Sequence, residues 1–109
     1  MIEYLKRGWL SPGCAAAGLR FASDIVTVEE VPDERAIDPA CRIAARARLA
    51  EVRRAATVEQ VELLEAVARD DHAPGLWARV NGHPQTDGLP ALRAALRAIR
   101  LIYVKDGTE

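Results

Sequence analysis

The chain has 109 residues, of which 50% are hydrophobic and 28% charged, and its formal net charge is −1. A chain of this size and apolar content fits a single small domain with its own hydrophobic core. The near-neutral total excludes a protein that is basic or acidic throughout, so a charged partner would have to be recognised by a local patch.

The first residues predict an N-terminal helical pair over residues 1–30. Ser11 and Pro12 form a helix start, because a capping hydroxyl precedes a proline that suits the first helical position. Apolar residues then recur every three to four positions to about Val26, which is typical of a helix with one buried face. Residues 4–10 are expected to form a short helix or turn packed on this helix.

The segment after this helix has two interpretations. Residues 25–31 are rich in β-branched side chains, which fit either the end of a helix or a short strand. The stretch 27–38 is acidic and interrupted by Pro32, and it is the candidate linker of the chain.

A second start signal, Asp38 followed by Pro39, predicts a helix from residue 39 to about residue 56. At about 100° per residue, one face of this helix is apolar and a neighbouring stripe is basic. The apolar face comprises Cys41, Ala45, Leu49, Val52 and Ala56, and the basic stripe comprises Arg42, Arg46 and Arg53.

Thr57 and Gln60 fit a capping box, which predicts a further helix from residue 58 to about residue 70. A short helix over residues 76–81 should follow and end at Asn81 and Gly82, with the glycine in a left-handed cap. The last helix is expected over residues 88–104. Its apolar face comprises Leu92, Ala95, Leu96, Ile99, Ile102 and Tyr103, and its basic stripe comprises Arg93, Arg97 and Arg100.

These elements predict an all-α fold, a single helical domain over residues 1–109 with four to six helices. The N-terminal pair would pack on a bundle over residues 38–105. Within that bundle, residues 58–104 have the order of a helix-turn-helix unit, in which the last helix enters the major groove of DNA.

A helix-turn-helix unit places cations near phosphates and polar groups near base edges. We expect the phosphates to be contacted by Arg93, Arg97 and Arg100, with Lys105. The residues expected near the base edges are Gln85, Thr86 and Arg93. Arg42, Arg46 and Arg53 would add to the phosphate contacts if their helix lies on the same side. Two features oppose this interpretation: the turn is long, and Asp87 would face phosphates. The alternative is that each arginine stripe is the solvated face of an amphipathic helix.

Other side chains fit contact with a protein. Glu59, Glu62 and Glu65 form an acidic face, which could be solvated, pair with the arginines of the preceding helix, or dock a basic partner. Trp9 is the better candidate for an exposed contact, whereas Trp77 is expected in the core. A protein-protein interaction module, such as a phage-encoded inhibitor or adaptor, is therefore the alternative function.

The sequence offers no catalytic or cofactor motif. His72, His83, Asp70 and Asp71 lack metal-ligand spacing, and no histidine is positioned by the sequence to activate Ser11 or Cys14. We therefore expect a protein that is not an enzyme and has no cofactor. Cys14 and Cys41 are expected as buried free thiols, and the absence of a leader or a span of about 20 apolar residues favours the cytoplasm and no membrane.

Three segments carry a family resemblance: "LSPGCAAAGLRFASD" over residues 10–24, "ARARLAEV" over residues 45–52 and "LPALRAALRAIRLIY" over residues 89–103. Together they resemble a family of small helical proteins of uncharacterised function, encoded in alphaproteobacterial genomes, prophages and gene-transfer-agent loci. The resemblance implies a helix-turn-helix or sigma-region-four-like transcription regulator that contacts DNA, RNA polymerase or both. It implies that Arg93, Arg97 and Arg100 lie on the recognition helix. The chain departs from the family in the longer segment "HAPGLWARVNGHPQTDG" over residues 72–88.

Overall fold

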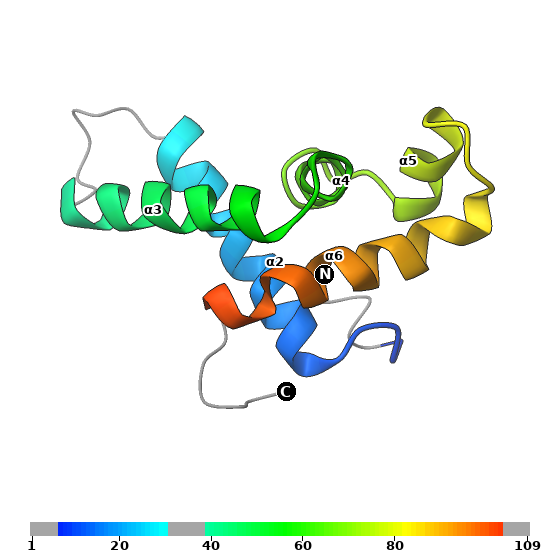
Figure 1. Cartoon of the computed structure of the whole chain (residues 1–109), viewed down its shortest axis with the longest axis horizontal. Helices are drawn as coiled ribbons and strands as arrows, with labels where there is room; N and C mark the ends of the chain where they lie inside the picture. The colour runs from blue at the N-terminus through cyan, green and yellow to red at the C-terminus, as the bar shows by residue number, and fades with distance from the viewer. Residues whose placement is uncertain (1–6, 31–38, 104–109) are drawn as a thin grey trace.

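The computed structural model describes residues 7–30 and 39–103, and these residues are all-α, without a strand (Figure 1). The predicted fold class is therefore confirmed. The α-helices in these ranges are α2 (Pro12–Ile25), α3 (Pro39–Ala55), α4 (Val58–Ala68), α5 (Pro74–Val80) and α6 (Gly88–Tyr103). A π-helical turn, η1 (Val26–Glu30), continues α2, and a 3-10 turn, η2 (Gln85–Asp87), leads into α6.

Side-chain caps define the starts of α2 and α4, as predicted. The hydroxyl of Ser11 accepts a hydrogen bond from the backbone N–H of Cys14. At α4, the N–H of Gln60 donates to Thr57 Oγ1 at 3.1 Å, and the N–H of Thr57 donates to Gln60 Oε1 at 3.0 Å. These bonds satisfy N–H groups that a helix start leaves without partners, so the helix boundaries follow from local sequence.

The structure selects one of the two interpretations of the segment after α2, and it shifts the start of α5. The segment after α2 stays helical to Glu30, where Thr27 Oγ1 donates to the carbonyl of Ser23 at 2.9 Å, so residues 25–30 are not a strand. Residue 31 and most of the predicted linker lie outside the described residues. Helix α5 begins at Pro74 rather than at residue 76, because the proline occupies the first turn of the helix, where its missing N–H costs nothing.

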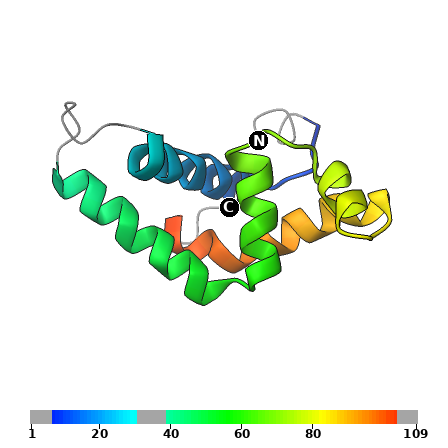
Figure 2. The ribbon, with the colours of Figure 1, turned by 90° about the horizontal axis from the view of Figure 1, so that it is seen from above.

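Helix α6 lies at the centre of the fold and packs on α2, α3, α4 and α5. In Figure 1 it runs below α3 and α4, and the view from above in Figure 2 shows α4 crossing it at a steep angle. Its predicted apolar face is buried at Leu92, Ala95, Leu96, Ile99 and Tyr103. One hydrophobic core runs from Leu10 to Tyr103 and draws on all five of these helices.

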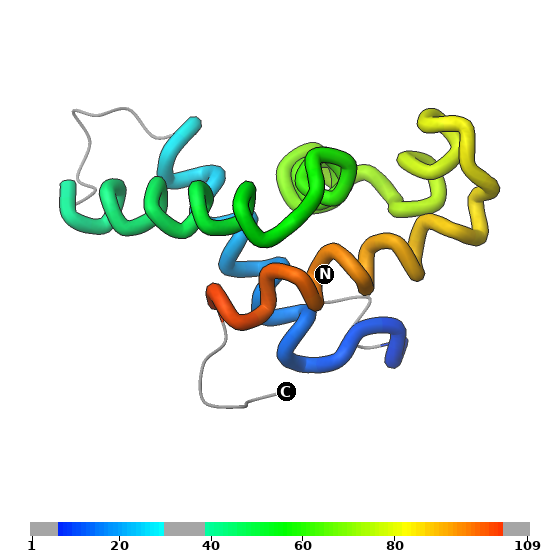
Figure 3. The backbone as a smooth tube through the Cα atoms, viewed as in Figure 1, coloured from blue at the N-terminus to red at the C-terminus, as the bar shows by residue number. Residues whose placement is uncertain are grey.

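The chain reverses direction between α5 and α6, at the right of the tube in Figure 3. Gly82 has a φ of +81°, as predicted for the left-handed position after α5. Gly88, the first residue of α6, lies against the backbone of Pro74, and a Cβ atom there would be 2.3 Å from the Pro74 carbonyl carbon. This contact holds η2 and the start of α6 against α5.

Candidate functional site

The two arginine stripes lie at different places in the structure. Arg53 lines a shallow hollow beside Phe21 and Ile25, near the C-terminal end of α2. The stripe on α6 lies instead beside Cys14, near the N-terminal end of α2. Cys14 and Ile25 are about 16 Å apart along the helix axis at about 1.5 Å per residue, so the two stripes do not form one surface.

Arg42, which was expected to add to the phosphate contacts, is only 8% exposed, and this burial does not favour such a contact. Arg42 shares a face of α3 with Ala45, Leu49 and Val52, so the inward face of the helix includes this arginine. Cys41, predicted to be buried, is exposed. The first turns of α3 extend past the neighbouring helices in Figure 1, and Cys41 lies in the first turn of this helix. Arg46 is exposed on α3 and lines none of the cavities described here.

Arg93, Arg97 and Arg100 line one cavity of about 430 Å³, which we call the arginine cavity. The opposite wall is the start of the described chain, and the Nε of Arg93 donates a hydrogen bond to the carbonyl of Trp9 at 2.6 Å. The other lining residues are Gly8, Trp9, Leu10, Ser11 and Cys14. None of these described lining residues is acidic.

The arginine cavity is electrostatically positive. Arg97 follows Arg93 by four residues and precedes Arg100 by three, and like charges at these spacings repel one another on a helix surface. The wall opposite them includes Ser11 and Cys14 at the start of α2, where the helix dipole adds partial positive charge. Within the described residues, neither Arg93 nor Arg97 forms an ion pair. An anion in the cavity would relieve this repulsion.

Gln85 and Thr86, predicted to lie near bases, are exposed in η2 and line a second cavity of about 430 Å³, the Trp9 groove. This groove runs along α5 and the start of α6 and meets the arginine cavity at Trp9, which lines both. Its other lining residues are Ala73, Pro74, Gly75, Leu76, Arg79 and Leu89. The side chains predicted to contact phosphates and those predicted to lie near bases therefore line two cavities that share Trp9.

Trp9 is 38% exposed, which confirms the expected exposed tryptophan, and Trp77 is buried as predicted. The guanidinium of Arg7 lies over the Trp9 ring, 5.0 Å from its centroid. Sequence reasoning did not assign Arg7 or Arg79 to the site, since neither belongs to a helical stripe with the α6 arginines. Lys105 lies outside the described residues.

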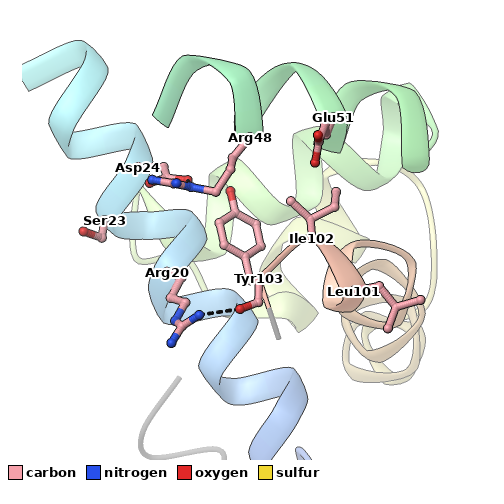
Figure 4. A pocket seen from close by; sticks show the side chains of 8 residues that line it. All are labelled: Arg20, Ser23, Asp24, Arg48, Glu51, Leu101, Ile102 and Tyr103. Atoms are coloured by element: carbon pink, nitrogen blue, oxygen red, sulfur yellow. Dashed lines mark hydrogen bonds and ion pairs between the residues drawn. The ribbon is translucent and has the colours of Figure 1, made fainter. Parts of the chain in front are cut away.

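A third cavity, of about 760 Å³, lies between α2, α3 and the end of α6 (Figure 4). Its lining is balanced in charge, with Arg20 and Arg48 against Asp24 and Glu51. The buried carboxylate of Asp24 accepts two hydrogen bonds from Arg48, each 2.8 Å long. Arg20 donates to the backbone carbonyl of Tyr103. These bonds tie three helices together, so we assign this cluster a structural role.

Tyr103 gives this cluster a testable pH dependence. Its buried hydroxyl has no hydrogen-bond partner among the described residues. Burial, and then the neighbouring Asp24 carboxylate, raise the pKa of Tyr103 well above its usual value near 10. The folded phenol therefore stays neutral at a pH where the unfolded phenol ionises, and the free energy of unfolding falls as the pH rises above about 10.

We expect Tyr103→Phe to remove this alkaline loss. At neutral pH the variant should unfold with a free energy within about 0.5 kcal/mol of the parent, because an unpartnered hydroxyl contributes little. Denaturant unfolding at pH 7 and about pH 11 checks both points. A loss above about 1 kcal/mol at pH 7 would show that the hydroxyl donates to Asp24.

The acidic face of α4 is only partly paired. Glu65 pairs with Arg69, the residue that follows α4, at 3.0 Å, and Arg69 also pairs with Glu29 at 3.4 Å. Glu59 lies 3.5 Å from the imidazole of His83, and Glu62 is exposed. The partners of Glu59 and Glu65 thus differ from the α3 arginines that the sequence offered.

Within residues 7–30 and 39–103, no three His, Cys, Asp or Glu side chains are grouped closely enough to hold a metal ion. Cys14 and Cys41 are both free thiols. None of the helices in the described part of the chain is both long and apolar enough to span a membrane.

Comparison with known proteins adds no relative. No protein-family model matches the chain, and no curated protein and no solved structure is significantly similar to it. The arginine cavity and the Trp9 groove are therefore the features from which a function can be inferred.

Proposed function

We propose that this protein is a non-enzymatic nucleic-acid-binding protein, and that Arg93, Arg97 and Arg100 contact the phosphates. The observation that supports this most strongly is the arginine cavity, where three arginines and the start of α2 meet and no described lining residue is acidic. Guanidinium groups bind phosphate oxygens with two parallel hydrogen bonds, and the dipole of α2 adds a weak preference for an anion. The third cavity, with its balanced charges, offers no such preference.

The exposed part of α6 fits contact with a nucleic-acid backbone better than deep insertion into a groove. Helix α6 packs on four other helices, so only a narrow side of it remains exposed. That side carries Pro90, Ala94, Arg97 and Leu101, of which Arg97 alone can hydrogen-bond. Phosphate contacts fix the position of a protein on nucleic acid without reading its sequence.

Together with the family resemblance, this surface leads us to propose a small transcription regulator of bacterial or phage origin. It would act on DNA, on RNA polymerase bound to DNA, or on both. Such a role needs no catalytic group, and the cavities contribute binding surfaces only.

Arg97→Glu tests the proposal with a single exposed side chain. At about 100 mM salt, affinity for a nucleic acid should fall at least about ten-fold, because one phosphate contact is lost and a repulsive charge is added. The matched control is Arg46→Glu, which makes the same change in net charge on exposed α3, outside the arginine cavity. Mobility-shift titrations measure both variants. Equal losses for the two variants would contradict a defined phosphate site.

An interaction module for another protein is the second candidate, because the Trp9 groove exposes Trp9 at 38% and Leu76 at 46%. Exposed large apolar side chains beside polar ones are typical of protein contacts. This candidate becomes the preferred function if the parent protein binds no nucleic acid even at about 50 mM salt, where phosphate contacts are strong.

A further inference from the structure

We infer that the nucleic acid is single-stranded, and that one of its bases stacks on Trp9 in the Trp9 groove while the adjacent phosphate occupies the arginine cavity. This inference depends on the proposed function and specifies its ligand. It assigns the groove to a base and the cavity to a phosphate, two parts that alternate along every nucleic-acid strand.

The two sites are joined through Trp9. The residue lines both cavities, and its backbone carbonyl accepts the 2.6 Å hydrogen bond from Arg93. An arginine of the phosphate site thus holds the main chain of the residue whose ring lines the groove. Because both cavities include Trp9 in their lining, we assign neighbouring parts of one strand to them.

The lining of the Trp9 groove suits a nucleobase. Leu76, Leu89 and Pro74 provide apolar contacts, and the volume of about 430 Å³ lies within the range of small-ligand sites. Gln85 and Thr86 add an amide and a hydroxyl that can hydrogen-bond the edge of a base. An indole ring can stack on any base, and we assign the base to the face of the Trp9 ring that Arg7 does not cover.

The charge around Trp9 fits a nucleotide better than an apolar peptide. Trp9 shares the lining of the arginine cavity with three arginines, Arg79 lines the groove itself, and Arg7 lies over the Trp9 ring at 5.0 Å. An uncharged apolar segment would gain nothing from these cations, whereas a strand carries one phosphate beside each base.

A duplex cannot use both sites at once. Bases in a duplex are stacked and paired inside the helix, so an aromatic side chain reaches them only in a single strand, a loop or an end. Non-specific single-strand binders combine a positive surface that follows the backbone with aromatic side chains that stack on bases. The arginine cavity and Trp9 provide these two parts.

The test measures the affinity of the full-length protein for four probes at fixed salt. These are oligo(dT), oligo(U), a duplex of equal length and an abasic strand that keeps the phosphates but lacks the bases. We expect both single strands to bind at least about ten-fold more tightly than the abasic strand and the duplex. Equal affinity for oligo(dT) and the abasic strand would overturn the inference while leaving phosphate binding intact. No binding of any probe would overturn the proposed function itself.

Trp9 variants locate the base. Trp9→Ala should weaken oligo(dT) binding about ten-fold and leave abasic-strand binding unchanged, whereas Trp9→Phe, which keeps an aromatic ring, should retain most of the affinity. Oligo(dT) should quench the tryptophan fluorescence of the parent. It should leave the fluorescence of the Trp9→Phe variant, which comes from buried Trp77, unchanged. Quenching that persists in this variant would overturn the assignment of Trp9.

Discussion

Replacing Arg93, Arg97 and Arg100 together by alanine is expected to lower nucleic-acid affinity by at least about 100-fold at 50 mM salt, because three charge-assisted phosphate contacts are lost. The dependence of affinity on salt should weaken at the same time. In a single strand each neutralised phosphate contributes roughly −0.7 to the log-log slope, so losing the phosphate of the arginine cavity should make the slope of the triple variant smaller by about 0.7. Binding isotherms at 50 and 200 mM salt measure both quantities.

The triple variant also loses the hydrogen bond from Arg93 to the Trp9 carbonyl, so its fold has to be checked as well as its charge. A double variant, Arg46→Ala with Arg54→Ala, removes exposed cations from α3, away from the arginine cavity, and should change the slope little. Thermal unfolding shows whether the triple variant keeps its fold. A folded triple variant with the affinity and the slope of the parent would rule out the arginine cavity as the phosphate site.

Gly88→Ala is expected to lower the free energy of unfolding by about 2 kcal/mol. The added Cβ would lie 2.3 Å from the backbone carbon and oxygen of Pro74, so α5 and α6 have to move apart. Such overpacking costs about 3 kcal/mol, and the better helix propensity of alanine recovers about 1 kcal/mol. Because the displaced elements form the Trp9 groove, base-dependent binding should also weaken. Denaturant unfolding measures the first effect.

Gly75→Ala is the matched comparison for Gly88→Ala. A Cβ on Gly75 would meet the Cγ of Gln85 at 2.7 Å, but this atom belongs to a flexible side chain that can turn away. We expect a loss below about 1 kcal/mol. If the two variants lose the same stability, the contact between Gly88 and Pro74 is not what holds α5 against α6.

Local sequence signals predicted most of the fold. The starts at Pro12 and Val58 and the turn at Gly82 depend on caps and on a backbone conformation that neighbouring residues specify. Burial of Arg42 was not predictable, because it depends on contacts that form only when the chain is folded. The sequence could not distinguish the helical continuation η1 from a short strand, because β-branched residues occur in both. Packing against the rest of the fold selects the helical form.

The candidate site was predicted only in part. Helical periodicity grouped Arg93, Arg97 and Arg100 and placed Gln85 before them, but it could not show what lies opposite. The carbonyl that Arg93 contacts belongs to Trp9, 84 residues earlier in the chain. Contacts at that separation leave no periodic signal, so the meeting of the arginine cavity with the Trp9 groove became visible only in three dimensions.

The most direct test of phosphate binding in the arginine cavity follows the arginine Nε–H signals of the labelled protein by nuclear magnetic resonance during titration with oligo(dT). Each signal reports one side chain, so the measurement locates the contact. If the phosphate binds in the arginine cavity, we expect saturable shifts for Arg93, Arg97 and Arg100. The signals of the α3 arginines, Arg46, Arg53 and Arg54, should not change. Larger shifts on α3 than on α6 would contradict it.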